Sequence, residues 1–104
     1  MYVDNRRRKP VEEFIEQLPE EDRAKVRAAI EFLAEVGNAL REPQSKSLGQ
    51  GLFELRVKSR RIFYCFQPSR IIVLLHGFTK KTQKTPPGQL VIGYKRMEEV
   101  KHEK

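Results

Sequence analysis

The fold is decided by residues 45–84, SKSLGQGLFELRVKSRRIFYCFQPSRIIVLLHGFTKKTQK. From Leu52 to Lys58 apolar and charged residues alternate, which is typical of a half-buried strand. The alternation resumes from Arg61 to Phe66 after a tight reversal at Ser59 and Arg60, and the run from Arg70 to Phe78 is apolar on both faces. We therefore expect an antiparallel hairpin followed by a central strand that is covered on both faces.

Helical patterns flank this stretch. Apolar residues recur at helical spacing from Lys9 to Leu18 and again from Glu20 to Val36, and they return from Pro86 or Gly88 to the end of the chain. A short strand at Met1 to Asp4 would precede the first helix. The sequence thus predicts an α+β fold, in which two N-terminal helices pack on a three- to four-stranded antiparallel sheet and a C-terminal helix closes the domain.

The composition limits the class of protein. A chain of 104 residues, 38% of them hydrophobic, predicts one folded domain over residues 1–104. Its single cysteine, Cys65, has no partner for an internal disulfide, and no cluster of metal ligands is evident, so we expect neither a metal nor a cofactor. The longest apolar run, Ile71 to Leu75, is too short to span a bilayer. We expect a cytoplasmic protein without a membrane partner.

The positive charge of the chain is concentrated in the strand region. Residues 45–84 carry a net charge of +8, whereas the whole chain carries +7. Such a field attracts polyanions, so RNA, DNA or a ribosome is the first partner to consider, and a solvated basic surface is the alternative. The stretch contains one acid, Glu54, and nine basic residues, namely Lys46, Arg56, Lys58, Arg60, Arg61, Arg70, Lys80, Lys81 and Lys84.

Four segments carry a resemblance to a known family. They are RKPVEEFIEQLP from Arg8, LFELR from Leu52, RRIFY from Arg60 and LLHGFTKKTQKTP from Leu74. In this order and spacing they resemble the RelE/HigB toxins of bacterial type II toxin–antitoxin systems, especially the phage-derived HigB-like branch. The resemblance implies a RelE-like fold and an endonuclease that cuts mRNA in the ribosomal A site without a metal. It also implies a small cognate antitoxin, expected to be a helix-turn-helix protein.

The resemblance also assigns roles to residues. The position of Glu54 carries the general base in related toxins, Arg61 matches an arginine that grips phosphate, and Lys81 matches a basic residue near the scissile phosphate. Arg56 joins this set because it lies two residues from Glu54 on the same strand face. The other basic residues expected to contact RNA are Lys46, Lys58, Arg60, Lys80 and Lys84.

The chemistry of such a reaction suits these residue types. A metal-free ribonuclease needs a base for the RNA 2′-hydroxyl, cations for the charge that develops on phosphorus, and an acid for the leaving oxygen. Glu54 and Arg56 satisfy the first two needs on one strand face. The alternative for Glu54 is a simple cross-strand ion pair with an arginine. The alternative for Arg61 is a structural clamp on the C-terminal carboxylate or on the third helix.

The acid that the reaction needs has no clear counterpart in the sequence. Related toxins place a Tyr or His near the chain end, where this sequence reads Thr85, Pro86, Pro87, and neither Tyr94 nor His102 aligns with that position. Two other functions therefore stay open, a ParE-like inhibitor of DNA gyrase and a nucleic-acid-binding protein without chemistry.

Two further polar side chains are expected in the core. His76 is predicted to be a hydrogen-bonded core residue that shares a strand face with Leu74 and Phe78, and a proton-transfer role is its alternative. Tyr64 is expected to be buried beside Ile62 with its hydroxyl at an edge.

Overall fold

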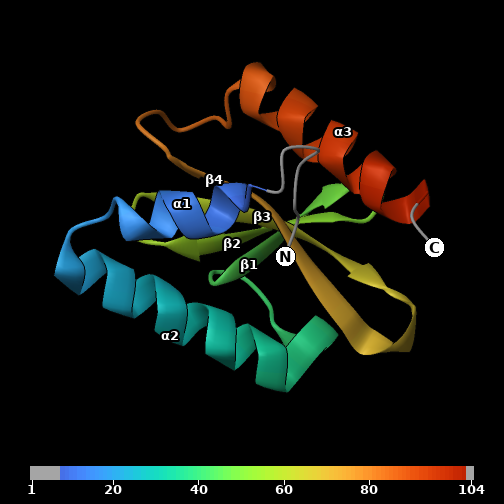
Figure 1. Ribbon diagram of the computed structural model, residues 1–104, viewed down its shortest axis with the longest axis horizontal. Helices are drawn as coiled ribbons and strands as arrows, with labels where there is room; N and C mark the ends of the chain where they lie inside the picture. The colour runs from blue at the N-terminus through green and yellow to red at the C-terminus, as the bar shows by residue number, and fades with distance from the viewer. Residues whose placement is uncertain (1–7, 103–104) are drawn as a thin grey trace.

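The computed structural model describes residues 8–102, which form three α-helices and a four-stranded sheet (Figure 1). This arrangement confirms the predicted α+β class with N-terminal helices and a C-terminal helix. None of the described helices is long and apolar enough to cross a membrane. The elements are α1 (Pro10–Glu16), α2 (Glu20–Val36), β1 (Ser45–Gly49), β2 (Leu52–Val57), β3 (Arg60–Gln67), β4 (Ile71–Thr79) and α3 (Pro87–His102), with short 3₁₀ turns at Gly37–Ala39 and Pro68–Arg70.

The sheet is a simple meander. Its strand order is β1-β2-β3-β4, and every neighbouring pair is antiparallel. Within the described residues β4 therefore lies at an edge of the sheet, whereas the sequence predicted a central strand. Its two faces are nevertheless covered, because α1 packs on one and α3 on the other. The strand expected at Met1 to Asp4 falls outside the described residues.

The first strand of the sheet, β1, was not predicted. Its sequence SKSLG contains one large apolar residue, Leu48, so it lacks the alternation that identified the other strands. Pairing with β2 creates this strand instead. Ser45 is buried and its hydroxyl is hydrogen-bonded to that of Tyr64 in β3, which explains how a polar strand start is accommodated in the core. The expected burial of Tyr64 is confirmed.

Helices α1 and α2 lie on one face of the sheet and α3 on the other (Figure 1), and a hydrophobic core lies under each. The alternation of β2 and β3 produces both, because successive side chains point to opposite faces. The face under α1 and α2 is formed by Val11, Ile15, Leu18, Val26, Leu33, Leu55, Ile62, Tyr64 and Leu74. The face under α3 is formed by Leu52, Phe63, Cys65, Val73, Leu75, Phe78, Met97 and Val100.

An irregularity in β4 changes which side chains share a face. Phe63 pairs with His76, but the next residue of β3, Tyr64, pairs with Leu74, so Leu75 is an extra residue in the ladder. A bulge of this kind shifts the alternation by one residue. Leu74 consequently packs under α1 and α2, whereas His76 stacks on Phe78 on the α3 side. The expectation that His76 and Leu74 share a face was therefore wrong.

The close packing of α3 on the sheet leads to a first prediction. A Cβ atom at Gly93 would lie 2.6 Å from the Phe63 ring and 3.3 Å from Leu52, whereas one at Gly88 in the same helix would meet nothing within 4 Å. We expect Gly93→Ala to be less stable than Gly88→Ala by ~1–3 kcal/mol, the usual cost of overpacking a core. Urea denaturation of both variants measures the difference. Equal midpoints would show that α3 does not pack this closely.

Candidate active site

Glu54 lies fully buried on the α3 side of the sheet, although it is charged. Its oxygen Oε1 accepts a hydrogen bond from Arg56 Nε at 3.0 Å and lies 3.7 Å from Arg61 Nε. The other oxygen, Oε2, accepts a hydrogen bond from the Thr85 hydroxyl at 3.2 Å. We call Glu54, Arg56 and Arg61 the Glu54 cluster. The structure thus brings three of the four predicted catalytic side chains into one charged cluster.

The register of the hairpin explains this cluster. Arg56 in β2 is directly opposite Arg61 in β3, and like charges in this position repel each other. Glu54 is two residues before Arg56 and points to the same face, so its carboxylate lies within reach of both guanidinium groups. The ion pairs that were the alternative for Glu54 are therefore present. The same contacts arrange two cations around one carboxylate, which are the base and the cations that a metal-free ribonuclease requires, without the acid.

Arg61 is held by its own hairpin. Its Nη1 atom donates to the carbonyl oxygens of Lys58 and Arg60, and its side chain is 14% exposed. Burial lowers the pKa of Arg61, while the charge of Glu54 raises it and that of Arg56 lowers it. A guanidinium group still remains protonated at neutral pH. Arg61 thus clamps the β2–β3 turn, whereas the clamp that was its alternative involved α3 or the C-terminal carboxylate, which lies outside the described residues.

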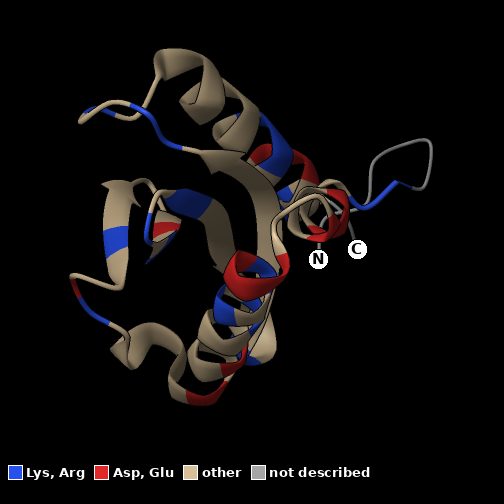
Figure 2. Cartoon of the chain, turned by 90° about the vertical axis from the view of Figure 1, so that its left-hand side faces the viewer, with Lys and Arg blue, Asp and Glu red and all other residues tan. Residues whose placement is uncertain are grey.

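The segment 80–86 connects β4 to α3 and lies over Glu54. The amide of Lys80 donates to the Ser59 carbonyl at 2.7 Å, and the hydroxyl of Thr82 donates to the Lys84 carbonyl at 2.8 Å. Thr85 then contacts Glu54. Lys81 and Lys84 are exposed between these contacts, and Figure 2 shows basic segments on this loop and on the strands that face it. The loop therefore carries two cations beside the cluster without burying them.

The other predicted RNA-contacting residues divide into two groups. Lys46 is exposed and pairs in register with Glu54, so it lies on the same face of the sheet. Arg60 and Lys58 instead form ion pairs with Asp22 at 2.9 and 3.9 Å at the start of α2. The bond from Arg60, together with the charges of both basic residues, lowers the pKa of Asp22. The structure thus places Lys58 and Arg60 with α2 rather than with the Glu54 cluster.

Comparison with protein families supports the resemblance. Residues 13–98 match the phage-derived protein Gp49-like family (DUF891). The chain belongs to the Gp49-like family. This family is part of the RelE/HigB-like toxin superfamily and is associated with toxin–antitoxin systems, so membership implies a cognate antitoxin as a partner. No curated protein matches the chain.

In this Gp49-like chain the candidate general acids are engaged elsewhere. The Tyr94 hydroxyl donates to the Leu48 carbonyl at 2.8 Å, and exposed His102 pairs with Glu98. Within residues 8–102 no group of three His, Cys, Asp or Glu side chains has an arrangement that would hold a metal ion. The contact of Thr85 with Glu54 was missed, because nothing in a sequence shows which loop hydroxyl meets a distant carboxylate.

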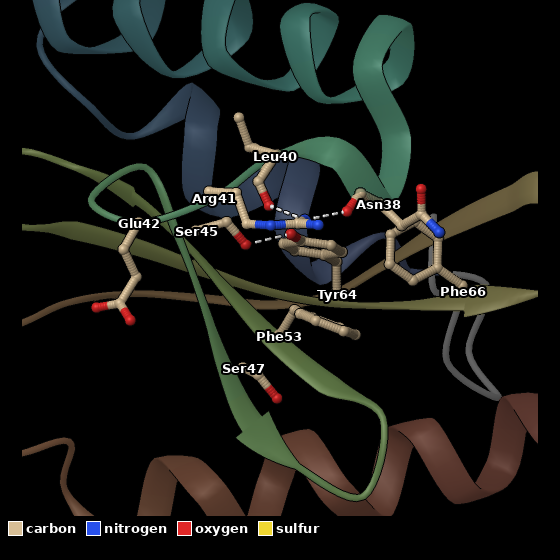
Figure 3. Close-up of a pocket in the computed structure, with 9 residues that line it drawn as sticks. All are labelled: Asn38, Leu40, Arg41, Glu42, Ser45, Ser47, Phe53, Tyr64 and Phe66. Atoms are coloured by element: carbon tan, nitrogen blue, oxygen red, sulfur yellow. Dashed lines mark hydrogen bonds between the residues drawn. The ribbon is translucent and has the colours of Figure 1, made fainter.

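A pocket of the Gp49-like chain lies on the opposite face of the sheet (Figure 3). It has a volume of about 430 Å³, and the rings of Phe53, Tyr64 and Phe66 line it. Burial raises the pKa of Tyr64, against the effect of its bond to Ser45, so its hydroxyl stays protonated at neutral pH. No residue of the Glu54 cluster lines this pocket. We therefore place the candidate active site at the cluster and not at the pocket.

His76 is hydrogen-bonded, as predicted, but it is only partly buried, and it joins β4 to α3. Its Nε2 atom bonds to the Gln89 side-chain oxygen, and its Nδ1 atom accepts a hydrogen bond from Arg96 at 3.2 Å. These contacts select the neutral ring, because protonation at Nδ1 would place a proton against a guanidinium donor. Burial lowers the pKa of His76, the bond to Gln89 raises it, and the charge of Arg96 lowers it.

The lowered pKa of His76 predicts a pH dependence of stability. In the unfolded chain His76 binds a proton near its ordinary pKa of about 6.5, whereas in the folded chain it binds one only at lower pH. The contribution of neutral His76 to the free energy of unfolding is therefore full above that value and is lost as the pH falls below it. We expect the urea midpoint to fall between about pH 7.5 and pH 5.5, and His76→Gln to reduce this fall. His102→Gln serves as the control and should retain it. If the urea midpoints of the parent and of His76→Gln fell equally with pH, the pH dependence could not be assigned to His76.

Proposed function

We propose that the protein is the toxin of a toxin–antitoxin pair and that it cuts mRNA on the ribosome, with Glu54 as the general base. One observation carries this proposal: a fully buried carboxylate is held between two arginines beneath a loop that carries two exposed lysines. Membership of the Gp49-like family supports the toxin role. The mRNA in the ribosomal A site is the proposed substrate.

In the proposed reaction the RNA 2′-oxygen forms a bond to phosphorus as the bond from phosphorus to the 5′-oxygen breaks. Glu54 takes the proton of a 2′-hydroxyl, the 2′-oxygen attacks the adjacent phosphorus, and the bond from phosphorus to the 5′-oxygen breaks. The products are a 2′,3′-cyclic phosphate and a 5′-hydroxyl, whose proton comes from an acid that we do not assign to a residue. Arg56 and Arg61 stabilise the additional negative charge on the phosphate in the transition state.

An unused donor of Arg61 supports this role. The Nε atom of Arg61 is buried and makes no hydrogen bond to any of the described residues, and its distance of 3.7 Å to Glu54 exceeds hydrogen-bonding distance. Leaving a charged donor unsatisfied costs free energy, and a bound phosphate oxygen would remove that cost. A planar guanidinium is also suited to phosphate geometry. Arg61 is therefore ready to accept an anionic ligand.

Replacing the base tests the proposal directly. Glu54→Gln removes the proton acceptor and keeps the shape, so cleavage mapped by primer extension should fall by roughly a hundredfold or more. Binding to pelleted ribosomes should persist, because the basic residues remain. Glu42→Gln is the matched control, since Glu42 is 69% exposed and lies 3.9 Å from the same Arg56.

Three outcomes of this experiment are informative. Undiminished cleavage by Glu54→Gln would remove Glu54 as the base. A parent protein that inhibits gyrase supercoiling and cuts no mRNA would establish the ParE-like alternative. Ribosome binding without cleavage or gyrase inhibition would establish the non-catalytic alternative. Thermal denaturation of each variant ensures that the assays compare folded proteins.

The lysines of segment 80–86 lead to a separate prediction about binding. If Lys81 and Lys84 contact RNA phosphates, the double change Lys81→Gln, Lys84→Gln should reduce the salt dependence of ribosome binding by roughly 0.7 per lysine on a double-logarithmic plot. Lys58→Gln is the control, because Lys58 pairs with Asp22. An unchanged slope for the double variant would place the RNA elsewhere.

A further inference from the structure

The burial of Glu54 presents a problem for the proposed base. Its carboxylate is 0% exposed, and all of its described polar contacts are made within the protein. A general base must come within about 2.6–3.2 Å of the proton that it removes. One of its present neighbours must therefore leave before a substrate hydroxyl can approach.

The contacts of Glu54 show which neighbour leaves most easily. Arg56 and Arg61 are charged and belong to paired strands, so their displacement would break ion pairs and disturb the sheet. Thr85 is neutral and belongs to a loop, and its bond at 3.2 Å is longer than that of Arg56 at 3.0 Å. Hydrogen bonds between charged partners are the stronger kind. The Thr85 contact is thus the one of the three that can open without separating an ion pair.

The chemistry of the Thr85 contact matches that of the substrate. In the protein an alcohol O–H donates to Glu54 Oε2, and in the proposed reaction another alcohol O–H, the RNA 2′-hydroxyl, donates its proton to the same carboxylate. Building on the proposed function, we propose that the Thr85 hydroxyl occupies the position of the RNA 2′-hydroxyl in the free protein. Segment 80–86 is then a lid that RNA displaces, and only a substrate with a 2′-hydroxyl replaces the lost bond.

The contacts of the segment are consistent with such a motion. The loop is fixed near one end by the bond from the Lys80 amide to Ser59. At the other end α3 begins at Pro87 and is joined to β4 through His76 and Gln89. Between these points Thr85 makes the contact that closes the loop over Glu54. Breaking that contact opens the cluster without breaking a strand pairing.

A comparison of three variants tests the proposal. Thr85→Val removes the hydroxyl and keeps the shape, Thr85→Ser keeps the hydroxyl, and Thr82→Val makes the same change in the same loop at a hydroxyl that bonds to a backbone carbonyl. Only molecules with an open lid bind RNA, so the apparent Kd equals the intrinsic Kd divided by the open fraction, and Thr85→Val raises that fraction. We expect Thr85→Val to lower KM for translating ribosomes roughly tenfold and to keep kcat within about threefold. Thr85→Ser and Thr82→Val should match the parent.

A second measurement tests the contact without any activity. The carboxyl carbon of Glu54, labelled with ¹³C, gives an NMR signal that is assigned by its absence in Glu54→Gln. Thr85→Val should shift this signal, whereas Thr82→Val should not. An unshifted signal in Thr85→Val would overturn the lid contact, whatever the kinetics.

The kinetic outcomes separate this proposal from the proposed function. If Thr85→Val shifted the Glu54 signal but lowered kcat at least tenfold, the Thr85 hydroxyl would be needed on Glu54 during the reaction. That result would overturn the proposal that Thr85 occupies the position of the RNA 2′-hydroxyl. An unchanged KM would also overturn it. A parent protein that cuts no RNA would overturn the ribonuclease function and the match to the 2′-hydroxyl together, while a shifted signal would still establish that the loop closes over Glu54.

Discussion

The buried carboxylate of Glu54 is the constraint on which the structure of this face depends. Arg56 and Arg61 are directly opposite each other in neighbouring strands, where two cations alone would repel. Glu54 offsets this repulsion, and the arginines in turn provide the partners that a buried anion requires. The cluster carries two cations and one anion, so removing Glu54 would leave two facing cations without their counter-ion. The cluster is therefore part of the fold, and its geometry is set before any ligand binds.

The sheet provides two surfaces with different tasks. One face packs under α1 and α2 through aliphatic and aromatic side chains, and the basic residues Lys58 and Arg60 secure α2 to the hairpin through Asp22. The other face combines an apolar core under α3 with the Glu54 cluster beside it. The extra residue in β4 directs His76 to this second face, where it connects the strand to α3. Both ends of segment 80–86 are thereby fixed close to Glu54.

Much of this arrangement was predictable, because period and charge are local properties of a sequence. The alternation in β2 placed Glu54 and Arg56 on one face, and the helical spacing gave α2 its bounds. Other features depend on contacts between distant residues. The strand β1 forms through pairing with β2 despite a polar sequence, and the pairing of Arg60 with Asp22 joins residues 38 positions apart. The bond from Thr85 to Glu54 spans 31 positions and left no signal that a pattern could reveal.

Burial of Glu54 and its proposed use as a general base place opposite demands on the site. A carboxylate that is shielded from water interacts more strongly with its arginines, which favours a fixed geometry. The same shielding keeps a substrate away. The structure separates these demands, since paired strands hold the arginines while a loop covers the remaining oxygen. Uncovering Glu54 therefore breaks a hydrogen bond of a loop and leaves the ladder of the sheet intact. A site built in this way keeps its charges in position in both the closed and the open state.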